Sequence, residues 1–343
     1  MSELSIVIPT LNEEASLRKL IASIAVQKGV EVEVIIADGG SADKTLTVGE
    51  DSGLRTVTLR GGRGRATQLN AGSLAARGEF ILFLHADSEL NNSVALRTAL
   101  NALRSASTEK YGQPYAGHFA IRFGNETGSF SRAYKCLECK ARLNRKGCSH
   151  GDQGILIPAE LFRKYGGFDE SCQILAETRL ADRLRENGQW LLLPVELTSS
   201  SRRFEVEGLK ERQILNAVIM ALGAVGREDM LDFSAAYATS NSSSKLQLAP
   251  VFRNIEERIK SLEEIERADF WEKIGRYICE NAWQVPFRAD LLVQRRAADA
   301  ANEGQYRFLE LYDRYLKRLA NNRFAVSLAA YAIRPWLKYM AKG

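Results

Sequence analysis

Polar side chains that could do chemistry follow four short apolar runs of the sequence. The segments are "PTLNEE" (9–14), "DGGSAD" (38–43), "RGGRGRATQLNAG" (60–72) and "HADSEL" (85–90). The hydroxyl, amide and carboxylate groups of the first two suit a base or a ribose, and the arginines and glycines of the third suit phosphate oxygens. The fourth segment places one carboxylate, Asp87, beside a histidine, His85. Together the segments could bind a phosphorylated ligand and a divalent cation.

The apolar runs in front of these segments are predicted strands. Strands are expected over 4–8, 32–37, 55–59 and 80–84, and helices over 13–27, 41–53 and 65–78. This alternation predicts an α/β fold with a doubly wound, mostly parallel sheet, in which ligands bind at the carboxyl ends of the strands. The sequence has no GxGxxG motif after its first strand and no GxxxxGK[ST] motif, which argues against dinucleotide oxidoreductases and P-loop enzymes.

The second part of the chain changes character at a Ser-rich stretch. Further strands are expected over 115–123, 154–158 and 190–194, and an apolar amphipathic helix over 209–226. The stretch "ATSNSSSKLQLAP" (238–250) then interrupts the pattern, and every later segment has helical spacing. We therefore expect a first domain over 1–237, a linker over 238–250 and a helical domain over 251–343.

The charge and hydropathy of the sequence limit where the chain is expected to be located and what it is expected to bind. Its 343 residues carry a net charge of +5, and residues from Lys245 onward hold 18 Lys and Arg against 13 Asp and Glu. Two interpretations of the tail stay open: it packs on the first domain or forms a homodimer, or it lays a basic face on a membrane or another anionic partner. With no secretion signal and no apolar run of membrane length, the expected location is the cytoplasm, with peripheral contact at the inner face of the membrane as the alternative. No nucleic-acid partner is expected.

Three cysteines and a histidine form a second constellation, spaced C-x2-C-x8-C-x-H. Its members are Cys136, Cys139, Cys148 and His150. Three thiols and an imidazole are a workable ligand set for structural zinc, but the first two cysteines also fit as small buried residues of a helix. The helix interpretation is favoured, and the zinc site is kept as the alternative. A third histidine, His118, lies in a strand pattern and is expected to be structural.

The quoted segments resemble a known family. "SIVIPTLNEE", "VEVIIADGGSADKT" and "GRGRATQLNAGSLAARGEFILFLHADS" are similar to family 2 glycosyltransferases of the GT-A fold, and in particular to a soluble bacterial subgroup with a His-Ala-Asp metal-site triplet. "GDQGILIPAELFRKYGGFDE" and "SSRRFEVEGLKERQIL" continue the resemblance, which covers roughly residues 4–235. The helical tail matches no family that we recognise.

The resemblance implies a role for individual residues. Asp87 would coordinate Mg²⁺ or Mn²⁺, and Glu177 and Asp152 would be the catalytic carboxylates, Glu177 as the base. The stretch "ILAETRLADRLRENG" departs from the family's Glu-Asp pair, so an ordinary glutamate at a helix N-terminus is the alternative for Glu177. The nucleotide-sugar-binding residues would be Pro9, Thr10, Asn12, Glu13, Asp38, Gly39, Ser41, Arg65, Gln68, His85, Gln153 and Arg203.

The function implied by the resemblance is an inverting, metal-dependent hexosyltransferase. It would use a nucleotide diphosphate sugar as donor, with a UDP-sugar favoured, and an unidentified acceptor. Two other functions stay open at this point: a catalytically silent module that binds nucleotide sugars, motivated by the incomplete Glu-Asp pair, and a nucleotidyltransferase, which shares this type of nucleotide-binding core.

Overall fold

The chain forms two compact units, Met1–Ser201 and Arg202–Gly343. This computed structural model describes residues 2–60, 62, 64–109, 115–124, 131–172, 174–232, 245–294 and 305–342. The boundary between the two compact units, after Ser201, therefore lies before the Ser-rich stretch at 238–250. Residues 238–244 of the expected linker lie outside the described residues, and residues 248–250 begin a helix. The domain boundaries expected at residues 237 and 250 stay predictions.

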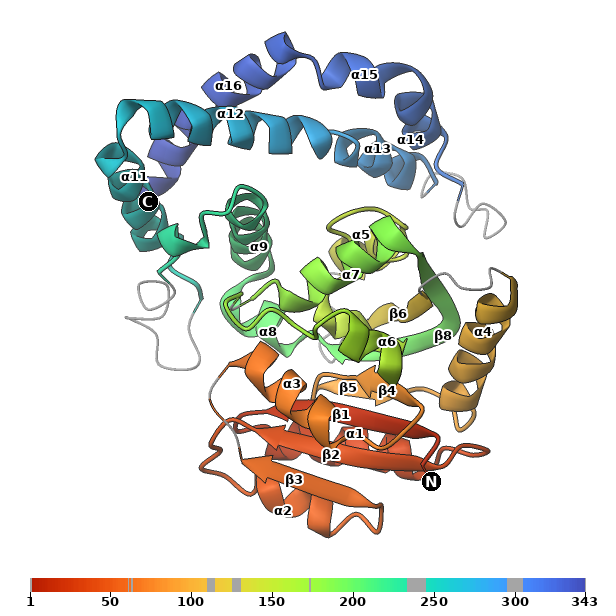
Figure 1. The fold of residues 1–343 in the computed structure, drawn as a ribbon. Helices are drawn as coiled ribbons and strands as arrows, with labels where there is room; N and C mark the ends of the chain where they lie inside the picture. Colours follow the sequence, from red (N-terminus) through yellow and green to blue (C-terminus); the bar gives the residue numbers. More distant parts are fainter. Residues whose placement is uncertain are drawn as a thin grey trace. The chain divides into compact units, whose positions relative to one another are not determined.

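The first unit is built on one eight-stranded sheet with the order β3-β2-β1-β4-β7-β6-β8-β5 (Figure 1). The strands are β1 (Leu4–Thr10), β2 (Val32–Asp38), β3 (Thr56–Arg60), β4 (Phe80–Phe83), β5 (Ser88–Leu90), β6 (Tyr115–Gly124), β7 (Ile155–Pro158) and β8 (Gln189–Ser200). Strands β3, β2, β1 and β4 are parallel, β6 is parallel to β8, and β7 and β5 are antiparallel to their neighbours. The α/β class and the doubly wound, mostly parallel sheet predicted from the sequence are confirmed.

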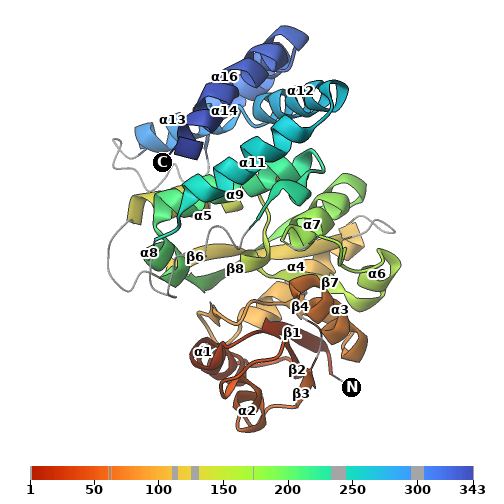
Figure 2. The same ribbon diagram turned by 90° about the vertical axis from the view of Figure 1, so that its left-hand side faces the viewer.

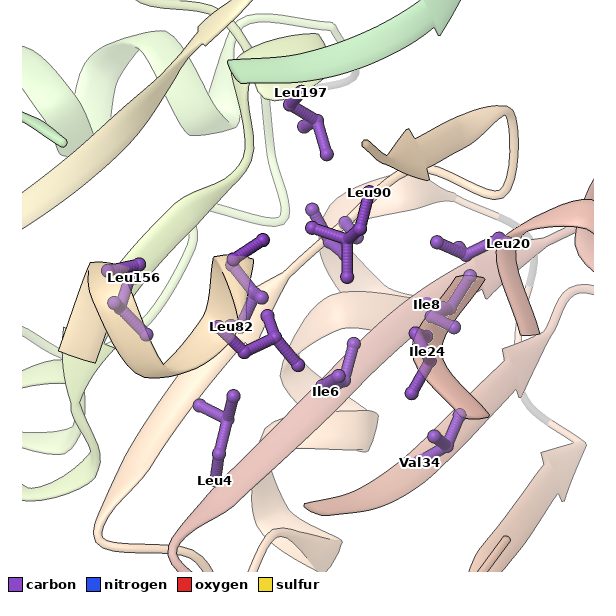
Figure 3. Packing of buried hydrophobic residues seen from close by; sticks show 14 of the residues in the cluster. Leu4, Ile6, Ile8, Leu20, Ile24, Val34, Leu82, Leu90, Leu156 and Leu197 are labelled. Carbon is purple, nitrogen blue, oxygen red and sulfur yellow. The ribbon is translucent and has the colours of Figure 1, made fainter. Parts of the chain in front are cut away.

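Helices cover both faces of the parallel strands. They are α1 (Glu14–Ala25), α2 (Thr45–Glu50), α3 (Arg65–Ala75), α4 (Ala95–Glu109), α5 (Ser131–Ala141), α6 (Ala159–Lys164) and α7 (Ala176–Asn187), with a 3-10 turn η1 (Gly151–Gln153). Leu20 of α1 packs in one buried cluster with Ile6 of β1 (Figure 3). On the other face, a Cβ at Gly72 of α3 would lie 2.3 Å from a methyl carbon of Val7. Because β1 side chains alternate between faces, the two helices sandwich the strand.

The second unit is helical throughout its described part, as the sequence predicts. Its elements are α8 (Arg202–Glu207), α9 (Leu209–Ala224), η2 (Glu228–Met230), α11 (Leu248–Ser261), α12 (Glu264–Glu280), α13 (Gln284–Gln294), α14 (Arg307–Leu311), the π-helical turn η4 (Tyr312–Leu316), α15 (Lys317–Ala320) and α16 (Arg323–Lys342). Helix α16 packs on α11 and α12 (Figure 2). The Trp336 ring meets the Phe252 ring edge-on at 5.3 Å, and a Cβ at Gly275 would lie 2.3 Å from the Val326 carbonyl oxygen. The glycine thus permits a close helix crossing.

Within the described residues we find no helix that is both long enough and apolar enough to cross a lipid bilayer.

Candidate functional site

The carboxyl ends of β1 and β2 are joined through the buried carboxylate of Asp38. Thr10 donates its hydroxyl to Asp38 Oδ1 at 3.2 Å. The N–H groups of Gly40 and Ser41 donate to Oδ2 at 2.9 and 2.8 Å, and the Ser41 hydroxyl donates to Oδ1. Burial acts to raise the pKa of Asp38, but these donors outweigh it and hold the pKa below its ordinary value. Asp38 is therefore an ionised hydrogen-bond acceptor at neutral pH.

Replacing Asp38 by asparagine is expected to destabilise the fold by about 1 to 3 kcal/mol at pH 7, because the amide leaves N–H donors unpaired. Since the pKa of Asp38 is lower in the folded chain than in the unfolded chain, its charge stabilises the fold above the unfolded pKa. That contribution begins to fall below the unfolded-state pKa and is lost as the pH falls through the lower folded-state pKa. Urea unfolding of Asp38→Asn and wild type should therefore converge toward pH 3, with exposed Asp51→Asn as control; a gap that is the same at both pH values would contradict this role.

The turn after β1 is fixed against the segment after β2. Asn12 has a positive φ of 55°, a conformation that asparagine tolerates better than most residues. Its N–H donates to Ser41 Oγ at 2.8 Å, and its side-chain oxygen accepts from the Ala42 N–H at 2.8 Å. The Glu13 N–H donates to Thr45 Oγ1 at 2.9 Å. The structure thus brings the predicted residues of the two strand ends together.

Gln68 ties helix α3 to both strand ends. Its side-chain amide donates to the carbonyl oxygens of Thr10 and Ala37, each at 2.8 Å. A Cβ at Gly39 would lie 3.1 Å from the same amide nitrogen, so glycine leaves room for it. Of the arginines in the loop before α3, Arg63 lies outside the described residues and Arg65 begins the helix.

The His-Ala-Asp triplet forms a turn between β4 and β5. The His85 carbonyl oxygen accepts the Ser88 N–H at 3.1 Å, and the Asp87 carbonyl oxygen accepts the Ser200 N–H at 3.2 Å, which ties the turn to β8. The Asp87 carboxylate is partly exposed and makes no hydrogen bond or ion pair within the part of the chain that the structure describes. It is therefore available to an external ligand.

A divalent cation fits this carboxylate. Among the described residues, no three His, Cys, Asp or Glu side chains gather closely enough to hold a metal ion by themselves. Mg²⁺ is commonly bound by one or two carboxylates, with substrate phosphates and water completing the shell. One available carboxylate thus suits a cation that arrives with a phosphorylated ligand and does not suit a closed structural metal site.

Glu177 lies beside the triplet and beside the start of α3. Its Oε1 is 3.5 Å from His85 Nε2 and 3.8 Å from Arg65 Nη1, and the side chain is about 95% buried. Burial acts to raise the pKa of Glu177, but the His85 contact and the charge of Arg65 hold it below its ordinary value. Glu177 Oε1 and His85 Nε2 are both buried without a hydrogen bond in the described structure. Glu177 is therefore ionised at neutral pH and keeps one carboxylate oxygen that can accept a further hydrogen bond.

Gly151 closes over this pair of side chains. A Cβ at Gly151 would lie 2.5 Å from both Glu177 Oε1 and His85 Nε2, closer than van der Waals contact allows. The sequence analysis did not single out Gly151, although "GDQG" begins with it. The available signal was a glycine that directly precedes a predicted catalytic residue, Asp152.

Replacing Gly151 by alanine is expected to displace Glu177 or His85 and to destabilise the fold by about 1 to 3 kcal/mol, the usual range for overpacking. Thermal unfolding would measure the loss. Gly62→Ala is the matched control, because a Cβ there meets only a Thr67 methyl group, at 3.8 Å. Equal melting temperatures for Gly151→Ala and wild type would contradict the observed packing.

The zinc alternative finds no support in the structure. Cys136, Cys139, Cys148 and His150 all lie within the described residues, and no metal-binding group is found there. His150 Nδ1 instead lies 3.0 Å from Thr178 Oγ1, and burial raises the pKa of the Cys148 thiol to about 11. We attribute the spacing to packing around α5.

The remaining predicted residues fall into three groups. Gln153 is buried and donates to the Cys148 carbonyl oxygen at 2.9 Å, while Asp152 follows Gly151 and keeps one carboxylate oxygen buried without a hydrogen bond in the described structure. His118 is structural as predicted: it stacks on Trp190 at 5.4 Å, and burial lowers its pKa to about 4. Arg203 belongs to the second unit, where its Nε lies 3.7 Å from Glu207, and its role at a diphosphate stays a prediction.

Comparison with known proteins identifies the segment that carries most of these residues. Residues 5–132 match the family model described as Glycosyl transferase family 2. This segment belongs to glycosyl transferase family 2. The family segment includes β1 to β6, with Asp38, Gln68 and the His-Ala-Asp triplet, and it ends before Gly151 and Glu177.

Curated relatives of the chain are glycosyltransferases, and a solved structure is similar to it in fold. A GalNAc(5)-diNAcBac-PP-undecaprenol beta-1,3-glucosyltransferase of Campylobacter jejuni is 30% identical over 43% of this chain and 47% of its own. A PGL/p-HBAD biosynthesis glycosyltransferase of Mycobacterium bovis is 38% identical over 50% of this chain and 66% of its own. The chain thus spans about half to two thirds of these relatives. The structure of the mannosyltransferase PcManGT from Pyrobaculum calidifontis, with GDP-Man and Mn²⁺, is 17% identical, has a TM-score of 0.51 and covers 98% of this chain and 87% of its own, which supports the GT-A fold.

Proposed function

We propose that this family 2 protein is an inverting, divalent-metal-dependent hexosyltransferase that transfers a sugar from a nucleotide diphosphate sugar to a hydroxyl acceptor. The observation that carries the proposal is the cluster of Glu177, His85 and Arg65. His85 is also the first residue of the triplet that ends in the available carboxylate of Asp87. Transfer from a diphosphate requires a base, a cationic side chain and a metal-binding carboxylate, and Asp87, two residues after His85, would supply the last of these.

The donor would bind with its nucleoside at the ends of β1 and β2. The hydrogen-bonded network of Thr10, Asp38 and Ser41 would hold the turn at Asn12 in place there, with the exposed Asn12 facing the nucleoside. The diphosphate would then extend toward Arg65 and Asp87. Asp87 would hold Mg²⁺ or Mn²⁺, which when bound neutralises charge on the departing diphosphate.

The bond changes of the proposed reaction balance in a single displacement. The acceptor hydroxyl oxygen forms a bond to C1 of the sugar, and the bond from C1 to the diphosphate oxygen breaks. The hydroxyl proton passes to Glu177, and the nucleoside diphosphate leaves with the electron pair. One displacement inverts the configuration at C1. Arg65, 3.8 Å from Glu177, would orient the carboxylate and face the charge of the leaving group.

A calorimetric panel tests the proposal at the level of binding. Titration of the full chain with UDP, GDP and their sugars, with and without Mn²⁺, should give tight binding only with the cation present, and Asp87→Asn should remove the cation dependence. The preference for a UDP-sugar is the expectation from the sequence, and the panel decides between UDP and GDP. If no nucleotide binds under any condition, the proposal is wrong.

A further inference from the structure

The last 30 residues of the chain carry positive charge alone. Residues 314–343 contain seven Lys and Arg and no Asp or Glu, whereas the whole chain has a net charge of +5. Residues 1–313 therefore have a net charge of −2, so the positive excess of the chain is concentrated in this segment. Helix α16 (Arg323–Lys342) makes up most of it. An anionic partner is the electrostatic complement of such a segment.

Helix α16 also exposes an apolar stripe on the face opposite its packed side. Val326, Ala330 and Ala341 are buried on the face of α16 that packs on other helices of the second unit. Four large side chains one to four turns apart on the other face are exposed by more than half of their area. These residues, which we call the α16 stripe, are Phe324 (77%), Leu328 (56%), Tyr331 (70%) and Tyr339 (70%). Their spacing places them along one side of the helix.

The segment before α16 also combines exposed apolar and basic side chains, with one acidic residue, Asp313, among them. Leu311, Tyr315 and Leu319 are exposed, and Lys317 and Arg318 are exposed among them. The guanidinium of Arg314 lies over the ring of Tyr315, 5.4 Å from its centre. Exposed apolar groups interleaved with basic side chains thus extend through both segments. Large apolar side chains gathered on an exposed surface mark an interaction site.

We propose that the α16 stripe and its flanking basic residues dock on the surface of an anionic lipid bilayer. Tyrosine and aliphatic side chains insert at the headgroup level, and Lys338 and Lys342 remain beside them to contact lipid phosphates. A second copy of the chain fits less well, because an antiparallel or parallel pairing of two such segments would oppose seven positive charges with seven more. A nucleic acid would match the charge but not the aliphatic centre of the stripe.

Vesicle sedimentation of the full chain tests the electrostatic part. The protein should bind vesicles of phosphatidylglycerol and phosphatidylcholine, bind weakly to phosphatidylcholine alone, and lose binding as salt is raised. Lys338→Glu with Lys342→Glu should lower the partition coefficient by about tenfold or more. Lys210→Glu with Lys245→Glu makes the same change of charge at two exposed positions of the second unit outside the segment, and should leave vesicle binding nearly unchanged.

Apolar variants test the stripe itself. Phe324→Ser with Leu328→Ser should also weaken vesicle binding by about tenfold or more, since two large apolar groups no longer leave water. Ile265→Ser with Val285→Ser is the matched control on α12 and α13, where both residues are more than 70% exposed. Circular dichroism melting confirms that each variant is folded. The proposal is overturned if the wild-type chain does not bind anionic vesicles, or if the control pair of substitutions weakens binding as much as the stripe pair does. It is also overturned if sedimentation shows a dimer that only the stripe variant dissociates.

Discussion

Replacing Asp87 by asparagine should lower kcat/KM for sugar transfer by about a thousandfold, the scale of loss when one group that stabilises developing charge is removed. The change keeps the shape of the side chain and removes the charge that would hold the cation. Because the carboxylate makes no hydrogen bond or ion pair with the described residues, the melting temperature should not change. Steady-state kinetics with a nucleotide sugar and Mn²⁺ would measure the rate, and calorimetry the melting.

Glu89 offers a matched control for this prediction. It is an exposed carboxylate in β5, two residues after Asp87. Glu89→Gln changes the net charge by the same amount in the same turn region and should leave kcat/KM within a factor of about two. Full activity of Asp87→Asn would rule out the metal role of Asp87.

The second large effect is expected at Glu177. Glu177→Gln should lower kcat by about 10²- to 10⁴-fold, the range for loss of a general base, with a smaller effect on donor binding. Glutamine is close in shape and still reaches His85 and Arg65, so the cluster should keep its packing. Presteady-state quench-flow with saturating donor and acceptor would isolate the transfer step.

Two further variants make the Glu177 test specific. Glu186→Gln alters an exposed carboxylate on the same helix, which pairs only with Lys146 at the surface among the described residues, and should have no effect on kcat. Asp152→Asn examines the other predicted catalytic carboxylate. A large loss in Asp152→Asn together with near-normal turnover in Glu177→Gln would assign the base to Asp152 instead. Normal turnover in both would favour neither residue as the base.

Most of the parallel half of the site could be predicted from the sequence. The strands that end at Thr10 and Asp38 are short, apolar and separated by a helical pattern, so their carboxyl ends had to meet at one edge of the sheet. The hydrogen bond between these two residues confirms that inference. Gln68 was predicted as a binding residue, whereas the structure shows it anchoring both strand ends.

The contacts of the antiparallel half could not be predicted in the same way. Glu177 and His85 are 92 positions apart, and their approach depends on how β7 pairs with β4 and on the turn at Gly151. No local pattern encodes that pairing. The three-residue strand β5 was too short to leave a period-two pattern.

Cysteine spacing was the weakest guide. C-x2-C on a helix is compatible both with metal binding and with packing, because residues three apart share a helix face. The burial of Cys139 and Cys148 is visible only once α5 is folded against the sheet. Compactness divides the chain after Ser201 because α9, which lies before the compositional break at 238–250, packs with the later helix α12.

Turnover of a donor by the purified full chain is the most direct test of the central claim. The protein should be incubated with UDP- and GDP-sugars and Mn²⁺, and the products analysed by mass spectrometry beside Asp87→Asn and Glu177→Gln. We predict that wild type releases a nucleoside diphosphate, with the sugar passing to water when no acceptor is present, and that both variants lose this activity. Binding without release of a nucleoside diphosphate from any donor, or release of pyrophosphate from a nucleoside triphosphate, would contradict the proposed reaction.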